Sequence, residues 1–105
     1  MMIRHSRPFY FLIALLSFAA GGGAYAQNPE NGQRLSERFC AGCHAIDASS
    51  KSRGAPPFAA IAAKEKITAE MIASFLLLPH ATMPNSPLTH TDTEDIAAFI
   101  MGMKK

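Results

Sequence analysis

The chain has 105 residues, and ten Lys and Arg against eight Asp and Glu give it a formal net charge of +2. So small a basic excess excludes nucleic acid as an expected partner, because nucleic-acid-binding domains gather many basic residues on one face. With only two cysteines in the chain, an extensive disulfide framework is excluded as well.

Residues 1–26 have the pattern of a cleavable secretion signal. A positively charged start precedes an apolar run and an A-x-A cleavage sequence: Arg4, His5 and Arg7, then residues 9–20, then Ala24-Tyr25-Ala26. The apolar run is shorter than the roughly 20 residues that a membrane-spanning helix needs. An uncleaved anchor stays open as an alternative, since no charged residue follows before Glu30.

Cleavage leaves residues 27–105 as one small domain without a membrane span. Its eight basic and eight acidic residues balance. A domain of this size has little core of its own, so a covalently bound cofactor would stabilise it. We expect the mature protein in a bacterial periplasm.

The mature chain has no alternating apolar and polar run of the kind that strands show, which predicts an all-α fold. Its first helix is predicted to begin at Asn28, Pro29 and Glu30, which supply a cap, a proline suited to the first turn and an acidic group at the positive end of the helix dipole. This helix runs directly into Cys40.

Cys40-Ala41-Gly42-Cys43-His44 indicates covalent haem attachment. Two thiols separated by two residues on a turn can each add to one vinyl group of a haem, and His44 then offers an axial nitrogen to the iron. A thioredoxin-like redox pair would follow a buried strand in a βαβ unit, and a zinc site would need two further ligands. The sequence provides neither context.

The remaining elements are predicted from composition and periodicity. Residues 47–57 indicate a loop, residues 58–64 a short helical turn, residues 68–78 a helix, and residues 79–90, with three prolines, a second loop that contains Met83. A capping box of Thr91 and Glu94 is predicted to begin the last helix, with Ile96, Phe99, Ile100 and Met103 on its apolar face.

These features, in this order, resemble a small bacterial class I c-type cytochrome across residues 28–103. The resemblance rests on the Gly-containing helix that enters the haem motif, the Gly-Ala-Pro-Pro-Phe stretch at 54–58 and the Met83-Pro84 loop before a terminal helix. It implies a cytochrome c-like fold in which three main helices and loops surround one covalently bound haem c. It also implies that Gly32 packs against an aromatic residue, with Phe39 and Phe99 as candidates, where the first and last helices cross.

The resemblance further implies the groups around the iron. The carbonyl of Pro56 is expected to accept a hydrogen bond from His44, with Pro57 as the alternative, and Met83 is expected to be the second axial ligand. Rival ligands are His80 and His90, which flank Met83. Met71, Met101 and Met103 have helical spacings that favour packing in the core.

With both axial positions filled, the predicted function is one-electron transfer between periplasmic redox proteins whose identity the sequence does not reveal. The chain is therefore not expected to be an enzyme. Two alternatives remain: a cytochrome subunit of a periplasmic dehydrogenase or oxidase complex, and a haem sensor or enzyme with a labile sixth ligand. The basic group Lys51, Arg53, Lys64 and Lys66 could surround the haem edge, although a solvated face is the favoured interpretation, because lysine usually lies in water whatever its role.

Overall fold

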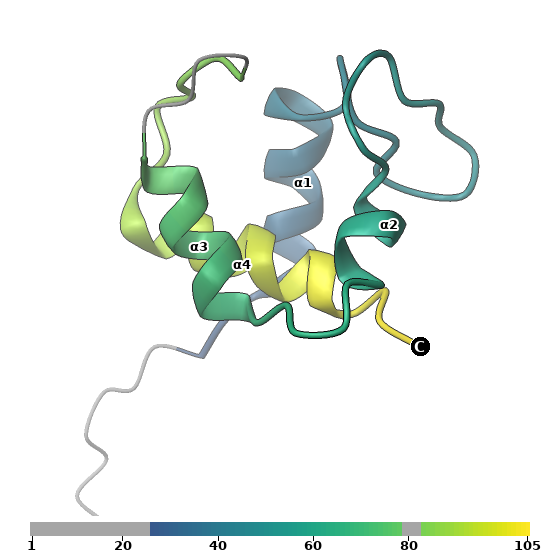
Figure 1. The fold of residues 1–105 in the computed structure, drawn as a ribbon. Helices are drawn as coiled ribbons and strands as arrows, with labels where there is room; N and C mark the ends of the chain where they lie inside the picture. Colours follow the sequence, from purple (N-terminus) through teal and green to yellow (C-terminus); the bar gives the residue numbers. More distant parts are fainter. Residues whose placement is uncertain (1–25, 79–82) are drawn as a thin grey trace, which may run out of the picture.

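The computed structural model describes residues 26–78 and 83–105, and this part of the chain is helical and contains no strand. Its four helices are α1 (Pro29–Phe39), α2 (Phe58–Ala62), α3 (Ala69–Leu77) and α4 (His90–Met101). Figure 1 shows α4 crossing the molecule, with α1, α2 and α3 arranged around it. The all-α prediction is confirmed. The predicted secretion signal, apart from Ala26, and the rival ligand His80 lie outside the described residues.

The start of α1 follows the sequence prediction. Asn28 has extended backbone dihedrals, and its side-chain Oδ1 accepts the backbone N–H of Asn31 at 3.1 Å. This bond satisfies one of the N–H groups that the first turn of a helix leaves without a partner. Pro29 stands at the first helical position, where its missing N–H costs nothing.

The crossing of α1 and α4 is a close backbone contact at Gly32. A Cβ placed there would lie 2.0 Å from the carbonyl oxygen of Asp95 and 2.9 Å from the backbone nitrogen of Ile96. The nearest atoms are therefore main chain. Phe99, on the same helix, packs edge-on against Phe58, with ring centroids 6.2 Å apart.

Asp95 joins these two helices through hydrogen bonds. Its side chain is fully buried. Oδ1 accepts the backbone N–H of Asn28 at 2.7 Å, and Oδ2 accepts the side-chain amide of Asn31 at 2.8 Å. The carboxylate thus lies at the positive end of the α1 dipole, where a negative charge is stabilised. Both contacts hold the start of α1 against the middle of α4.

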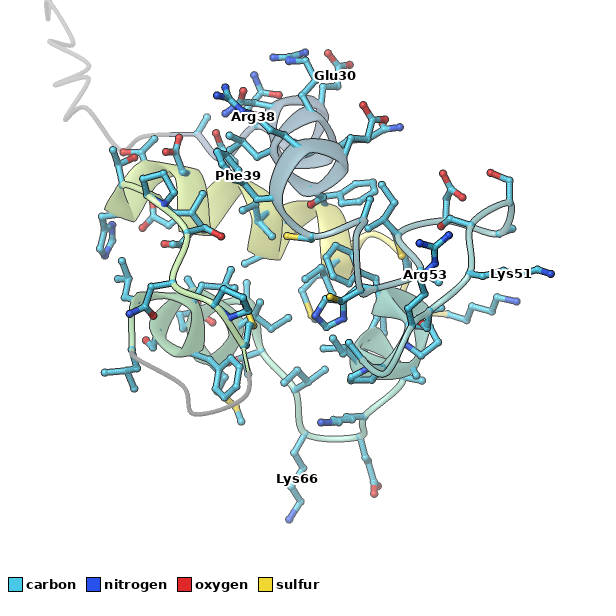
Figure 2. All side chains as sticks on the ribbon, turned by 90° about the horizontal axis from the view of Figure 1, so that it is seen from above. Glu30, Arg38, Phe39, Lys51, Arg53 and Lys66 are labelled. Carbon is cyan, nitrogen blue, oxygen red and sulfur yellow. The ribbon has the colours of Figure 1, made fainter. Side chains whose placement is uncertain are left out.

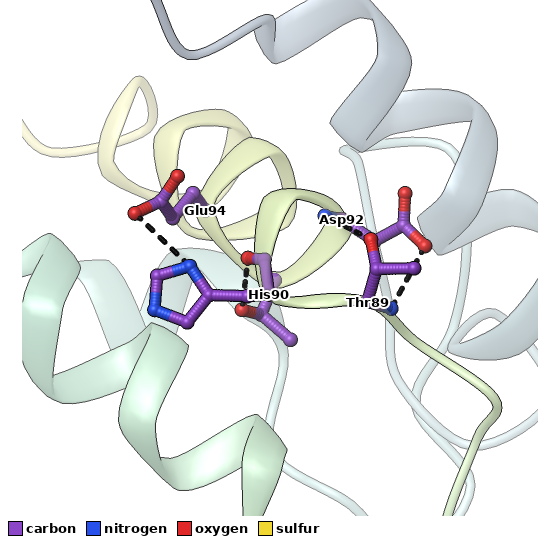
Figure 3. A network of polar contacts seen from close by, with 5 residues as sticks. Thr89, His90, Asp92 and Glu94 are labelled. Carbon is purple, nitrogen blue, oxygen red and sulfur yellow. Dashed lines mark hydrogen bonds and ion pairs between the residues drawn. The ribbon is translucent and has the colours of Figure 1, made fainter. Parts of the chain in front are cut away.

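The capping box of α4 lies two residues earlier than predicted (Figure 3). Thr89 accepts the backbone N–H of Asp92 at 3.1 Å, and the Asp92 carboxylate accepts the Thr89 N–H at 3.0 Å. The prediction of Thr91 with Glu94 was wrong because two overlapping Thr-x-x-acid patterns fit the motif. The pattern that begins at Thr89 starts the helix two residues earlier than the one at Thr91 would. The carboxylate of Glu94 lies 3.4 Å from Nδ1 of His90.

The third helix begins and ends close to its predicted limits, with Thr68 as its N-cap and Leu78 as its C-cap. It buries Ile72 and Ala73, which join the core formed with Ile96, Ala97 and Ile100 of α4. Met101 and Met103 pack against this core as predicted. Met71 does not, because it is 53% exposed. None of the described helices combines the length and apolar character needed to cross a membrane.

Candidate functional site

Residues 40–44 form a tight turn directly after α1. The backbone N–H groups of Cys40 and Ala41 both reach the carbonyl of Ser36, at 2.8 and 2.9 Å, and the His44 N–H bonds to the Cys40 carbonyl at 2.9 Å. This turn brings both cysteines and His44 onto the wall of one cavity. Cys40 is buried and Cys43 is exposed, and both are free thiols.

The two thiols differ in environment. Burial raises the pKa of the Cys40 thiol, and its hydrogen bond with Ser36 lowers that pKa to a smaller extent. Cys40 is therefore a neutral thiol at neutral pH. Such a thiol is a weak metal ligand, because metals bind the thiolate.

The His44 ring has a fixed orientation and tautomer. Its Nδ1 lies 2.6 Å from the carbonyl oxygen of Pro56. A carbonyl oxygen can only accept a hydrogen bond, so Nδ1 carries the hydrogen and Nε2 keeps its lone pair for a ligand. The ring also packs on Phe58, with centroids 5.3 Å apart. Pro56, and not Pro57, makes this contact.

The loop between the motif and α2 is tied back to the motif by serine hydroxyls. Ser52 Oγ accepts the backbone N–H of Ala45, and Ser50 Oγ accepts that of Ile46, each at 2.9 Å. Backbone bonds from Arg53 to the Cys43 carbonyl and from Phe58 to the Ala45 carbonyl, both at 2.8 Å, complete the connection. These bonds fix Pro56 relative to His44. The sequence analysis identified this segment as a loop but did not foresee the serine contacts.

A cavity of about 470 Å³ lies in front of His44. Its volume is within the range of about 300–1,000 Å³ that is typical of cofactor sites. Most of its walls are apolar, and all four helices or their ends contribute. The lining residues are Phe39, Cys40, Gly42, Cys43, His44, Gly54, Ala55, Pro56, Phe58, Ile61, Lys64, Ile67, Met71, Ile72, Phe75, Leu76, Met83, Pro84, Ser86, Ile96 and Ile100.

Met83 lines the same cavity as His44, as an axial pair requires. Met71 lines it too, and both Met71 and Phe75 are more than half exposed. Exposed apolar side chains around an apolar cavity are what a flat hydrophobic group would cover. His90, the described rival ligand, lies away from this cavity, in a groove between α3 and α4.

These residues fit a covalently bound haem. Cys40 and Cys43 would hold it through thioether links, and His44 Nε2 and the Met83 thioether would be its axial ligands. Phe58, Ile72, Phe75 and Leu76 are among the apolar side chains that line the cavity. One important residue was missed: Asp95, which the sequence analysis did not connect with α1, because its partners lie 64 and 67 positions away.

The basic residues of the predicted group do not all face the cavity. Lys64 lines it, whereas Figure 2 shows Lys51 and Lys66 projecting away from the body of the protein. Arg38, on α1, places its guanidinium 5.0 Å from the ring centroid of Phe39. The outward positions favour a solvated role for Lys51 and Lys66.

Comparison with known proteins agrees with this geometry. The model of the cytochrome c family, described as "Cytochrome c", matches residues 29–104. A cytochrome c-552 from Bradyrhizobium diazoefficiens is 34% identical over 102 residues, which cover 95% of this chain and 96% of that protein. No solved structure matches the chain at a significant level.

Proposed function

The chain belongs to the cytochrome c family, and from this premise we propose that it is an exported one-electron carrier whose haem iron is bound by His44 and Met83. A cytochrome c carries covalently bound haem c and transfers electrons to and from redox proteins. The residues of the site, the axial ligands and the location are the parts that we propose. The haem supplies a reversible Fe(II)/Fe(III) couple.

The contact between His44 and Pro56 carries the proposal. A metal-binding histidine needs a partner on its other ring nitrogen, which sets the tautomer and the ring orientation. Here the Pro56 carbonyl, 2.6 Å from Nδ1, is such a partner. This bond and the contact with the Phe58 ring orient the His44 imidazole. A site built in this way changes little when it gains or loses an electron, which suits rapid transfer.

Met83 supports a carrier over an enzyme. A thioether is a soft, uncharged ligand that stabilises ferrous iron and raises the reduction potential. With His44 on one side and Met83 on the other, a substrate could reach the iron only by displacing a ligand. The cavity walls are mostly apolar, and Lys64 is a basic residue among those that line them.

An absorption spectrum of protein matured with the cytochrome c assembly machinery tests this proposal. We expect attached haem in both oxidation states and, in the ferric state, a weak long-wavelength band from sulfur-to-iron charge transfer. Met83→Ala should abolish that band, and Met101→Ala, a change of the same kind in the core, should leave it in place. Persistence of the band in Met83→Ala would refute the ligand assignment.

Two further measurements separate the carrier from the alternative functions. A free carrier elutes alone from a native periplasmic extract, whereas a complex subunit co-elutes with a dehydrogenase or oxidase. A stable Met83 ligand also prevents carbon monoxide from binding the ferrous protein at neutral pH. Rapid carbon monoxide binding would favour a sensor or enzyme with a labile sixth ligand.

We also propose that residues 1–26 direct export to the periplasm and are then removed. The A-x-A sequence that ends at Ala26 supports this assignment. Residues 26–28 are exposed and precede α1, so the backbone on the mature side of the cleavage point is accessible. Intact-mass measurement of the purified periplasmic protein should give a chain that begins at Gln27.

A further inference from the structure

The structure has a second hollow, which shares no lining residue with the cavity that contains the haem motif. This groove, of about 190 Å³, runs between α3 and α4 and also contacts Gln27. Among the described residues that line it there is no lysine or arginine, but there are two carboxylates, those of Glu70 and Glu94. The groove therefore has an excess of negative charge that the haem site does not use.

The backbone next to this groove is anchored. Asn28 donates its N–H to the buried carboxylate of Asp95 at 2.7 Å, and Asn28 is also the cap of α1. Gln27 directly precedes Asn28, so the Cα atoms of these two residues lie about 3.8 Å apart. The anchoring of Asn28 therefore restrains the position of Gln27 at the groove. In the uncleaved chain the nitrogen of Gln27 is a neutral amide. After cleavage at Ala26 it becomes an ammonium group with three hydrogen-bond donors.

We propose that this groove is a docking site for the N-terminus that cleavage creates, with the α-ammonium of Gln27 held by Glu70 of α3 and Glu94 of α4. The inference rests on the proposed cleavage after Ala26. Maturation would then add a contact between the start of α1 and the other two long helices, which the precursor cannot make.

The charges around the groove determine the sign of the expected effect. Glu70, Glu94 and the nearby Asp95 favour the ammonium form, because opposite charges stabilise each other. The positive helix ends near Pro29 and Ala69 oppose it. His90, 3.4 Å from Glu94, would compete for that carboxylate when protonated. Three full negative charges outweigh the partial charges of the helix ends.

The α-amino pKa should therefore lie above the ordinary range of about 7.7–8.0. Since these are partly exposed pairs, the shift should be modest, about half a pH unit. A pKa raised in the folded state stabilises the protein at pH values below the ordinary pKa. That contribution disappears as the pH rises through the raised value.

The experiment uses the haem-loaded periplasmic protein in its diamagnetic ferrous state. Intact mass first establishes the N-terminus, and reductive methylation with ¹³C-formaldehyde then labels the amines for pH titration by NMR. Glu70→Gln and Glu94→Gln should each lower the α-amino pKa by about 0.3 unit, and the double variant should return it to the ordinary range. Glu65→Gln removes the same charge from an exposed residue outside the groove and should leave the pKa unchanged.

The outcomes separate the two proposals. A chain that begins elsewhere than Gln27 would refute the cleavage proposal, and the docking site with it. A chain that begins at Gln27 with an unshifted α-amino pKa, or with a shift that the two groove variants do not reduce, would refute the docking site alone. Gln27 cyclised to pyroglutamate, with loss of ammonia, has no ammonium group and would also refute the docking site.

Discussion

Gly32→Ala should destabilise the protein strongly, although alanine is the better helix former. The added Cβ would lie 2.0 Å from the Asp95 carbonyl oxygen and 2.5 Å from its carbonyl carbon, where ordinary contact begins near 3.4 Å. The atoms it meets belong to the α4 backbone, so no side chain can rotate away. The helices must instead separate by about 1.4 Å, which loosens the Asp95 hydrogen bonds and the packing around Ile96.

The expected magnitude follows from two opposing effects. Overpacking of a core costs about 1–3 kcal/mol, and more where the backbone must move. Alanine in place of glycine inside a helix stabilises the helix by about 1 kcal/mol, which offsets part of that loss. We expect a net loss of about 3 kcal/mol in the free energy of unfolding, since the displaced crossing also weakens buried hydrogen bonds.

Denaturant unfolding of the haem-loaded protein, followed by far-UV circular dichroism, measures this loss. Gly102→Ala is the matched control, because Gly102 has φ −63° and a Cβ there would be 3.4 Å from its nearest neighbour. That variant should stay within about 1 kcal/mol of the wild type. A Gly32→Ala protein within about 0.5 kcal/mol of the wild type would show that the close crossing of α1 and α4 is not a feature of the folded protein.

Three further predictions concern contacts outside the haem site. Thr89→Ala should lower the free energy of unfolding by about 1 kcal/mol and Thr91→Ala by clearly less, since Thr89 is the cap. A larger loss in Thr91→Ala than in Thr89→Ala would support the capping box of Thr91 and Glu94 that the sequence predicted. Asp95→Asn should lower the free energy of unfolding, measured with urea, by about 1.5–3 kcal/mol, because the new amide nitrogen would face a hydrogen-bond donor of Asn28 or Asn31. An unchanged free energy of unfolding would contradict these buried hydrogen bonds. The hydrogen bonds from Ser49, and then those from Ser50, lower the pKa of Asp47. The ionised Asp47 carboxylate should therefore stabilise the protein at pH values above its ordinary pKa, and this stabilisation should disappear as the pH falls through its lowered pKa. An NMR titration of the Asp47 carboxyl that gives an ordinary or raised pKa would contradict this prediction.

Local chemistry explains which features the sequence could predict. The start of α1 depends on Asn28 and Pro29, which act within one turn, and the start of α3 depends in the same way on its N-cap Thr68. The contact of His44 with Pro56 spans only 12 positions and was expected from the resemblance. These features depend on residues close together in the chain, so a sequence pattern can describe them.

Other features depend on choices that the sequence leaves open. Two overlapping Thr-x-x-acid patterns both satisfy the capping motif, and the structure uses the one that begins at Thr89. The helical spacing of Met71 predicts a buried face, yet the buried residues of α3 are its neighbours Ile72 and Ala73. Asp95 has a polar side chain at a buried position, and its role depends on α1, which no local pattern reveals.

The two sides of the candidate haem site are therefore held in different ways. His44 is positioned by short-range bonds to Pro56 and by the serine contacts of the adjoining loop. Another part of the wall includes Ile96 and Ile100 of α4, whose distance from the end of α1 depends on the Gly32 crossing and the Asp95 bonds. A substitution at Gly32 should thus disturb the spectrum of the bound haem, although the residue is not in the cavity wall. Thr89→Ala, which weakens α4 at its start and leaves the crossing intact, should reduce stability with little spectral change.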